Sequence, residues 1–382
     1  MAGLRAGIRT RGMAEDCYSS GRRRRPGRSA RGGTDDGQGA AGDPREPGLV
    51  RVGGGPGVTV MQAQDHAVRA YSDDDAGVWD ELVARSCNGT MLHTRRFLSY
   101  HGERFRDRSL LVTDVRGRIV GALPAAEDPA DPSVVSSHPG MTYGGLVHGP
   151  TLFGGPMIGL FETIAAQYRS LGYTRLRYKA VPAIYQSTPA ADDLYALFRL
   201  GASRYRCDLA AVVGLDYGRP LSRQRARGRK HALRAGVRVE DGWGNIAAFW
   251  RILETNLARR HNSAPTHSLA EIEYLHDRFP GSFFLIVAKI GDSLVGGDVH
   301  TIEGPVLQGR YTATTDEGRA ACATDLLFER GIALAREQGC RFFSFGTSTL
   351  DEGRALNGPQ YDYKISFGAT GLTHDHYELS LR

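Results

Sequence analysis

The stretch from Arg341 to Leu381 decides the fold and reads RFFSFGTSTLDEGRALNGPQYDYKISFGATGLTHDHYELSL. Its opening run, Arg341 to Thr347, is apolar and aromatic, as expected for a buried strand. Residues Asp351 to Arg354 have turn chemistry, and a last strand is expected near Tyr377 to Leu381. Between them, Lys364 lies among aromatic residues in a chain with only four lysines. Because lysine is seldom buried without a partner, we expect Lys364 either to reach solvent or to meet an anion.

The size and charge of the chain set its class. A chain of 382 residues is comfortable for two domains, and no apolar run is long enough to cross a bilayer. Residues 1–60 contain eleven arginines against six acids, so they carry most of the formal net charge of +6. The five cysteines are scattered without a CxxC pair, which is typical of a reducing cytoplasm and argues against a disulfide framework or a zinc site. We therefore expect a cytoplasmic globular protein without a metal.

Residues 1–64 form an Arg/Gly-rich segment that is poor in branched apolar residues. Such a segment cannot bury enough surface to offset the entropy lost on ordering, so we predict a disordered tail. It has no apolar stretch of the kind found in a secretory signal. The tail is either an RNA-binding arm or a dispensable extension, with initiation near Met61.

The order of expected elements repeats in the two halves of the chain. Each half has a hairpin, a strand, a helix and a closing strand. In the first half these are expected at 110–115 with 119–124 (the hairpin), 143–147, 155–171 and 175–179. In the second half they are expected at 284–289 with 294–299 (the hairpin), 308–313, 321–338 and 341–345. Two further helices are expected at 246–260 and 269–277. The Val-Gly pairs at 120 and 295 are 175 residues apart, and the glycines at the helix ends, Gly172 and Gly339, are 167 apart. Two α+β units, at residues 65–216 and 241–382, explain the length.

A basic connector, residues 217–240, joins the two units. From Arg219 to Arg238 it holds eight basic residues and no acid. Ser222 is a suitable N-cap for a helix, although Gly228 and Gly236 weaken the helix pattern. A helix of this charge density suits contacts with phosphates, and we predict RNA binding through Arg225, Arg229, Lys230 and Arg234. The alternative is a solvated linker helix whose charges pair with acids elsewhere.

The doubled α+β unit, the basic connector and the segment Tyr361 to Gly368 resemble the FemABX-like proteins, which are tandem repeats of the GCN5-related N-acyltransferase (GNAT) fold. Residues 256–261, 265–268 and Phe279-Pro280 are also similar to that family, and the resemblance covers about residues 70–382. It implies two tandem GNAT-like domains and amide-bond formation by attack of an amine on an activated acyl group. Relatives take the acyl group from aminoacyl-tRNA or from acyl-CoA, and no bound cofactor is implied.

The resemblance also implies roles for single residues. Lys364 occupies the place of a lysine at the active channel, and Tyr311 that of an aromatic residue lining it. His267 stands where relatives often have an arginine that faces the anionic part of the acceptor. Tyr143 and Arg96 fall where the first repeat contributes to acceptor binding.

Aminolysis needs a neutral amine, a donor for the tetrahedral oxyanion and a proton for the leaving group. Lys364 could stabilise the oxyanion or hold a phosphate, Tyr311 and Tyr361 could donate hydrogen bonds, and Asp298 could orient or deprotonate the amine. Each of these residues also has a structural explanation, as a core aromatic residue or a paired charge. No Ser/His/Asp order or reactive cysteine indicates a covalent acyl-enzyme.

The segment that binds the CoA pyrophosphate in GNAT proteins is not matched here. Thr314 to Ala321 includes Gly318, but Thr315 replaces the expected Arg or Gln, and Asp316 and Glu317 would repel phosphate. We therefore expect aminoacyl transfer from charged tRNA to an amine of a peptidoglycan precursor or a small peptidic metabolite. Two alternatives stay open, an acyl-CoA-dependent N-acetyltransferase of the same fold and a non-catalytic RNA-binding protein.

Overall fold

The computed structural model describes residues 66–382, apart from the side chains of residues 260 and 261. The predicted tail at residues 1–64 lies outside the described residues. The first half of the chain contains β1 (His66–Ala70), α1 (Ala76–Arg85), α2 (Arg95–Leu98), β2 (Leu110–Asp114), β3 (Ile119–Leu123), β4 (Ala126–Asp128), β5 (Asp131–Ser136), β6 (Val147–His148), α3 (Gly155–Ser170), β7 (Arg175–Lys179), α4 (Asp192–Arg199) and β8 (Ser203–Gly214). A 3-10 helix, η3 (Ser99–Arg104), follows α2 directly.

The second half opens with the connector helix. It contains α5 (Arg223–Arg234), β9 (Val237–Asp241), α6 (Ile246–His261), α7 (Leu269–Arg278), β10 (Phe283–Ile290), β11 (Ser293–Glu303), β12 (Val306–Thr314), α8 (Asp316–Ala320), α9 (Ala323–Glu337), β13 (Phe342–Thr347), β14 (Thr349–Leu350), β15 (Ala355–Leu356), α10 (Gly358–Ile365) and β16 (Thr370–Ser380). Both predicted hairpins, the long helices and the strand that opens the deciding stretch are therefore present.

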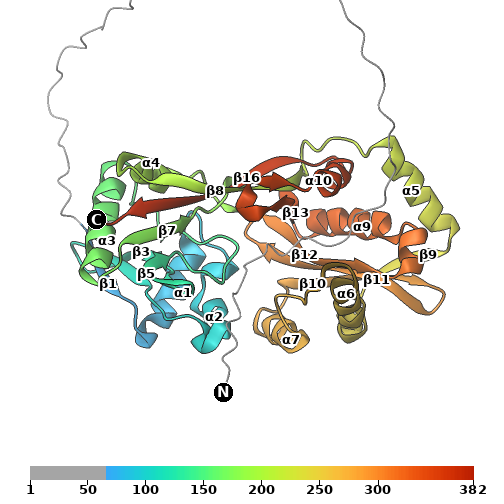
Figure 1. The fold of residues 1–382 in the computed structure, drawn as a ribbon, viewed down its shortest axis with the longest axis horizontal. Helices are drawn as coiled ribbons and strands as arrows, with labels where there is room; N and C mark the ends of the chain where they lie inside the picture. The colour runs from blue at the N-terminus through green and yellow to red at the C-terminus, as the bar shows by residue number, and fades with distance from the viewer. Residues whose placement is uncertain (1–65) are drawn as a thin grey trace, which may run out of the picture.

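One ten-stranded sheet runs through both halves, in the order β4-β5-β7-β16-β8-β13-β12-β11-β10-β9. Its centre is the antiparallel pair β8 and β16. The last strand of the first half, β8, pairs with β13 of the second half, and the last strand of the chain, β16, pairs with β7 of the first half. Each half thus gives its final strand to the other, and Figure 1 shows β8 and β16 running side by side between the halves.

The strand order is repeated outward from this centre. On one side β16 is antiparallel to β7, which is parallel to β5, and on the other β8 is antiparallel to β13, which is parallel to β12. In the second half, the single strand β11 pairs with both β10 and β12. In the first half the corresponding segment is divided into two strands in different sheets, β3 and β4, which together correspond to β11. The repeat predicted from the spacing of the Val-Gly pairs and helix-end glycines is therefore present in the topology.

Three apolar cores flank the sheets. One packs α3 against β2, β5 and β7, and another packs α9 against β10, β11, β12 and β13. The third joins the halves, because Trp79 of α1 and Phe97 of α2 belong to the same core as Trp250 of α6 and Leu275 of α7. In Figure 1, α6 and α7 lie below the large sheet and α9 and α10 above it.

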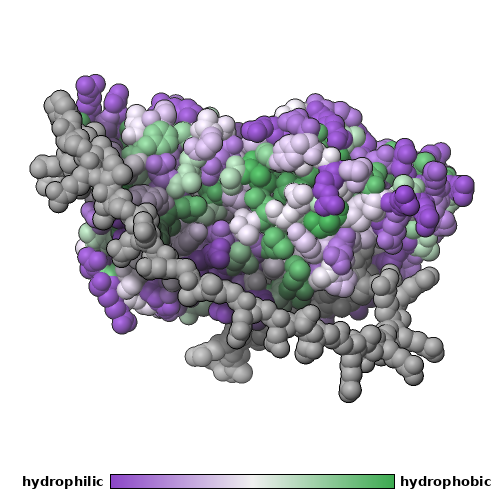
Figure 2. Space-filling model, turned by 90° about the horizontal axis from the view of Figure 1, so that it is seen from above, coloured by the Kyte–Doolittle hydropathy of each residue, from purple (hydrophilic) through white to green (hydrophobic). Residues whose placement is uncertain are grey.

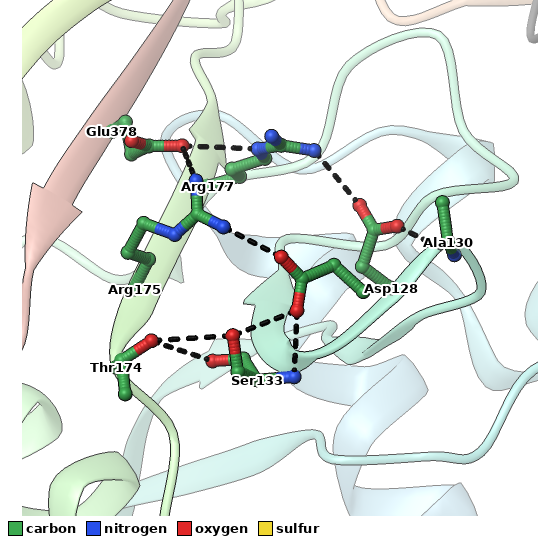
Figure 3. A network of polar contacts seen from close by, with 8 residues as sticks. Asp128, Ala130, Ser133, Thr174, Arg175, Arg177 and Glu378 are labelled. Atoms are coloured by element: carbon green, nitrogen blue, oxygen red, sulfur yellow. Dashed lines mark hydrogen bonds and ion pairs between the residues drawn. The ribbon is translucent and has the colours of Figure 1, made fainter.

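Charged side chains also connect β16 to the first half. Figure 3 shows Arg175 and Arg177 of β7 between Glu378 of β16 and the carboxylates of the β4–β5 hairpin. Arg175 lies 2.6 Å from Asp131, and Arg177 lies 3.1 Å from Glu378 and 3.2 Å from Asp128. A polar groove of about 420 Å³ beside this network is lined by hydroxyl and charged side chains of β5, β7, β8 and β16.

The structure differs from the sequence-based expectations in several elements. The expected strand at 143–147 is reduced to the two residues of β6, because Gly144 and Gly145 pack closely against Ser137 and Tyr178 and leave the strand pairing. Residues around Lys364 form the helix α10, which Asn357 caps and which has Pro359 in its first turn. The connector forms a helix as expected, and the Ser222 hydroxyl accepts a hydrogen bond from the Arg225 N–H (3.3 Å).

Candidate active site between the two halves

A β-bulge on β12 sets the geometry of the site. The register between β11 and β12 shifts between Val299, which is opposite Tyr311, and His300, which is opposite Gly309. Arg310 is therefore the extra residue. In a regular strand, neighbouring side chains point to opposite faces. Here the side chains of Arg310 and Tyr311 both lie in the region between the halves. Arg310 contacts Thr301 and Glu303, and Tyr311 packs on Trp250. Bulges commonly re-aim side chains near active sites.

Tyr311 lies in a chain of three side chains that crosses from one half to the other. Its hydroxyl lies 2.7 Å from Nδ1 of His267, which stands just before α7. Nε2 of His267 lies 3.1 Å from the hydroxyl of Tyr100, in η3 of the first half. Tyr311 and His267 are buried, and Tyr100 is partly exposed. The structure therefore brings two of the predicted site residues together and adds a third.

The second feature of the site is a buried ion pair. The Arg310 guanidinium contacts the Glu303 carboxylate directly, and its Nη1 donates to Thr142 of the first half (3.3 Å). The hydroxyl of Tyr143, also from the first half, donates to Glu303 Oε2 (2.7 Å). Tyr185 donates to Gln308 close by (2.6 Å). Tyr143, predicted to bind substrate, thus lies in the interface, with its hydroxyl held by a carboxylate of the other half.

Burial controls the protonation of these groups. It lowers the pKa of His267 to about 4, and the Arg310 charge lowers it further in the same direction. Burial raises the pKa of Tyr100 to about 12 and raises that of Tyr311 well above its usual range. For Arg310 burial opposes the charge, but Glu303 and the surrounding tyrosines outweigh it, so the pKa of Arg310 is raised. At neutral pH the site therefore contains the Arg310 cation paired with Glu303, neutral tyrosines and a neutral imidazole.

Helix α7 holds this arrangement closed against the first half. Arg104 pairs with Glu271 of α7 (2.8 Å), and Arg278 donates to Ser99 (3.2 Å). Arg96, a predicted acceptor-binding residue, is exposed on α2, and its guanidinium carbon lies 4.4 Å from the ring centroid of Phe279. Arg96 therefore lies at the rim of the interface, not at the chain of Tyr100, His267 and Tyr311.

Lys364 and Tyr361 lie on α10, apart from this chain. The Lys364 ammonium is buried and donates to the backbone oxygens of Gly346 (3.3 Å) and Thr347 (2.7 Å) at the end of β13. It therefore binds the carbonyl groups at the C-terminal end of a central strand of the sheet. Tyr361 packs against Gly371 of β16. The catalytic role of Lys364 and the substrate-binding role of Tyr361 stay predictions.

Asp298 lies on the opposite face of the sheet from Tyr311. Its carboxylate accepts a hydrogen bond from Thr312 (2.8 Å) and lies 3.2 Å from His300 Nε2. His300 in turn packs under Gly331 of α9. Adjacent positions on a strand point to opposite faces, which is why Asp298 is directed toward α9 while Val299 is directed toward the interface. The structure does not bring Asp298 to the other predicted catalytic residues, and its role stays a prediction.

The four residues predicted to bind RNA divide into two pairs on α5. Arg225 lies 2.6 Å from Asp325 of α9 and is half-buried, whereas Arg229 lies 2.7 Å from Glu329 and is itself exposed. Lys230 and Arg234 are exposed, as are Arg223 and Arg227. Positions 223, 227, 230 and 234 follow helical spacing and form one face. In Figure 2 hydrophilic side chains gather at the end of the molecule where α5 lies.

The segment where GNAT proteins bind pyrophosphate has a different structure here. Residues 316–320 form the short helix α8, and the side chain of Thr315 accepts a hydrogen bond from the Gly318 N–H (3.0 Å). A Cβ at Gly318 would lie 2.3 Å from the Val295 oxygen, so this glycine packs on β11. In the first turn of α9, the Asp325 carboxylate already receives hydrogen bonds from Arg225 and from Tyr363 (2.8 Å).

Sequence reasoning missed Tyr100 and the Arg310–Glu303 pair. The signal for the pair was a charge of each sign in two otherwise apolar strands, where an unpartnered charge is rare. Tyr100 carried no local signal, because its partner His267 is 167 residues away. Within residues 66–382 there is no cluster of His, Cys, Asp and Glu suited to a metal. No helix in the same range has the length and apolarity needed to cross a bilayer.

Comparison with known proteins supports this description. Residues 220–364 match the family model described as acetyltransferase (GNAT) domain. The fold is similar to that of FemX, with a TM-score of 0.58 and 12% identity over 82% of this chain and 97% of that chain. It is also similar to L-PGS from Bacillus licheniformis, with a TM-score of 0.53 and 12% identity over 80% and 91%. No curated protein sequence matches.

A conserved protein of unknown function from Bacteroides thetaiotaomicron has the same fold, with a TM-score of 0.52 and 9% identity over 82% of this chain and 99% of that chain. At such identities the likeness establishes the fold. The family match establishes the type of domain in the second half. The chain therefore has the predicted FemX-like fold of tandem GNAT units, and its second half contains an acyltransferase domain of the GNAT type.

Proposed function

We propose that this protein forms an amide bond by transferring an aminoacyl group from aminoacyl-tRNA to the amine of a small peptidic acceptor. The observation that carries the choice of donor is the carboxylate of Asp325 in the first turn of α9. A helix N-terminus favours an anion, and here the protein supplies its own. A CoA pyrophosphate would have to displace Asp325 from Arg225 and would also meet Asp316 and Glu317.

The exposed face of α5 supports a nucleic-acid donor. Arg223, Arg227, Lys230 and Arg234 have no ion pair among the described residues, and Arg225 and Arg229 fix the helix to α9 from the other side. Cations in a row without ion pairs repel one another unless an anion binds to them. The phosphates of a tRNA would neutralise it, and binding would weaken steeply with salt.

The interface would hold the reacting groups. The Arg310 guanidinium, fixed by Glu303, acts electrostatically on Tyr311, and it would stabilise an oxyanion or the acceptor carboxylate. Tyr311 supplies a hydroxyl beside the amine, and Tyr143 orients Glu303. The first half would therefore help to form the acceptor site, and the GNAT-type second half would hold the acyl group.

The test is transfer of a radiolabelled amino acid from charged tRNA to a mixture of small peptides, with the product detected as ribonuclease-resistant label. We expect label in the peptide fraction, abolished when ribonuclease is added before the enzyme. Charge reversal of Lys230 and Arg234 should weaken tRNA binding by at least about tenfold at low salt. Reversal of the exposed Arg116, in the β2–β3 turn, is the matched control and should leave binding unchanged. Transfer that is insensitive to ribonuclease would contradict the proposal.

A second candidate is favoured by the family match itself, whose description is acetyltransferase. In that case acetyl-CoA would raise the melting temperature, as any ligand of the native state does. The arrangement at Asp325 leads us to expect no shift. A clear shift with acetyl-CoA, together with no transfer from tRNA, would favour the second candidate.

A further inference from the structure

The contacts of Tyr311, His267 and Tyr100 define a direction for hydrogen bonding. The backbone N–H of His267 donates to the Tyr311 hydroxyl (3.3 Å), and the hydroxyl proton can then be directed to Nδ1 of the same histidine (2.7 Å). A neutral imidazole that accepts at Nδ1 carries its proton at Nε2, which then donates to the Tyr100 hydroxyl (3.1 Å). One assignment of protons thus satisfies all three contacts and leaves the Tyr100 proton free to point outward.

The two ends of this chain differ in their surroundings. At the inner end Tyr311 packs in a T-shaped contact with Trp250, whose buried indole N–H has no hydrogen-bond partner among the described residues. Buried donors of this kind are rare in proteins, and each one requires an explanation. At the outer end Tyr100 is partly exposed, at the edge where η3 meets α7. The chain therefore connects an enclosed polar position with solvent.

We propose that Tyr311, His267 and Tyr100 are a proton path between the reacting centre and solvent, and that the first half of the chain supplies its outer end. The inference rests on the proposed function for the identity of the reaction. Tyr311 is the residue that would touch the acceptor amine. His267 and Tyr100 are positioning residues that act through it.

Proton transfer along the path balances in both directions. An N–H bond of the acceptor ammonium breaks and its proton bonds to the Tyr311 oxygen. The Tyr311 proton passes to Nδ1, the Nε2 proton passes to the Tyr100 oxygen, and the Tyr100 proton leaves to water. The electron pair of the broken bond stays on nitrogen, which then attacks the acyl carbon. When the ester oxygen of the ribose leaves, the same steps run in reverse and Tyr311 gives it a proton, which restores the starting tautomer. The attacking nitrogen, which carries one proton too many after the attack, loses that proton to water as the amide forms.

The charges around the path keep the imidazole neutral during transfer. Arg310, which is paired with Glu303, lies at the inner end, and Arg104, which is paired with Glu271, lies over the Tyr100 ring at the outer end. The His101 ring beside Tyr100 is neutral, because burial lowers the pKa of His101 to about 3. An imidazolium between these cations would be destabilised. Protons therefore enter one nitrogen as they leave the other, and no charge accumulates on His267.

The first experiment follows the His267 ring by nitrogen-15 NMR in the full chain, with the resonance assigned by its loss in His267→Gln. We expect a neutral ring protonated at Nε2 at pH 7.5. The Nε2 proton should exchange with solvent through Tyr100, so Tyr100→Phe should slow this exchange by about tenfold. Tyr217→Phe, which removes an exposed tyrosine hydroxyl after β8, is the control and should not change it.

The outcomes are distinct. If Tyr100 has only a structural role, Tyr100→Phe would loosen its contact with His267 and leave the exchange of the Nε2 proton unchanged or faster. That result would overturn the proposed path. Protonation at Nδ1 also overturns it. In the transfer assay, Tyr100→Phe should lower kcat by at least about tenfold with little change in KM, and imidazole buffer should restore it. If the wild type transfers nothing from tRNA or CoA, the proposed function fails, and the exchange measurement still decides the path.

Discussion

At the scale of single residues, the Arg310–Glu303 pair determines how the halves meet. Both side chains are buried, and Thr142 and Tyr143 of the first half bond to them. An ion pair taken out of water is stable only while both partners and their hydrogen bonds are present. The bulge that lets Arg310 and Tyr311 face the same side explains how one strand supplies both the charge and the hydroxyl of the site.

Glu303→Gln should destabilise the protein strongly, because it leaves the Arg310 charge buried without a counter-charge. We expect a loss of about 3–5 kcal/mol in the free energy of unfolding, measured by urea denaturation. The double variant Glu303→Leu with Arg310→Met should recover much of that loss. The control is Glu240→Gln, which breaks a more exposed pair with Lys289 and should change stability by less than about 1 kcal/mol. Equal losses for Glu303→Gln and Glu240→Gln would contradict this account.

Lys179 is a half-buried cation, and it predicts a pH dependence. Its ammonium donates to the backbone oxygens of His138 (3.2 Å), Pro139 (3.0 Å) and Met141 (2.8 Å), and burial lowers the pKa of Lys179 to about 7. The unfolded chain keeps a lysine pKa near 10.4, so between pH 7 and 10 it binds more protons than the native state. The contribution of Lys179 to stability therefore rises with pH above 7 and falls as the pH drops toward 7.

We compare the free energy of unfolding of the wild type with that of Lys179→Met. The wild-type value minus the variant value should rise between pH 7 and pH 9, by up to about 1.4 kcal/mol per pH unit. Urea denaturation at a series of pH values gives this difference directly. Lys289→Met, which removes a lysine from an ion pair nearer the surface, is the control for loss of a lysine. A difference that falls with pH would show that the Lys179 pKa is not lowered in the native state.

At the scale of elements, Gly228 explains why α5 can carry opposed functions on its two faces. The glycine stands in the middle of the helix, and a Cβ there would lie 1.7 Å from Oδ2 of Asp325. The absent side chain lets α5 approach α9 closely enough for Arg225 to reach Asp325. The opposite face stays exposed and fully cationic. The glycine that weakens the helix pattern in the sequence is therefore what fixes the helix in place.

Replacing Gly228 by alanine should destabilise the protein, by about 1–3 kcal/mol, because the new methyl group collides with a buried ion pair. In an ordinary helix position the same change would stabilise by about 0.5–1 kcal/mol. Gly77 in α1 serves as the control, because a methyl group added there would meet no atom within 4 Å. Thermal unfolding of the two variants should show shifts of opposite sign. A stabilised Gly228→Ala would mean that α5 does not depend on this close approach.

At the scale of the whole molecule, the exchange of final strands makes the two halves one folding unit. The pairs β7–β16, β16–β8 and β8–β13 all cross between the halves. The core that contains Trp79 and Trp250 also crosses. The division of the chain into domains at residues 65–216 and 241–382 stays a prediction. In the structure, β16 of the second unit completes the sheet of the first unit.

We expect a single cooperative transition on heating, with equal calorimetric and van't Hoff enthalpies. A fragment of residues 241–382 lacks β8, which leaves the edges of β13 and β16 unpaired, so it should not give a transition of its own. A chain ending at residue 369 lacks β16 and should fail for the same reason. Two separate transitions in the full chain would show that the halves unfold independently.

The sequence by itself determined the repeated units, the hairpins, the long helices and the cationic connector, since hydrophobic period, turn residues and caps act over a few residues. It also indicated the FemABX-like family and drew attention to Tyr311, His267 and Tyr143. Only the tertiary structure decided which of these meet. Tyr143 reaches Glu303 across 160 residues and Tyr100 reaches His267 across 167, and no local pattern encodes such pairings. The register and packing of the whole sheet decide the direction in which each side chain points. They account for the strand exchange, for the bulge at Arg310 and for the separation of Asp298 and Lys364 from the interface.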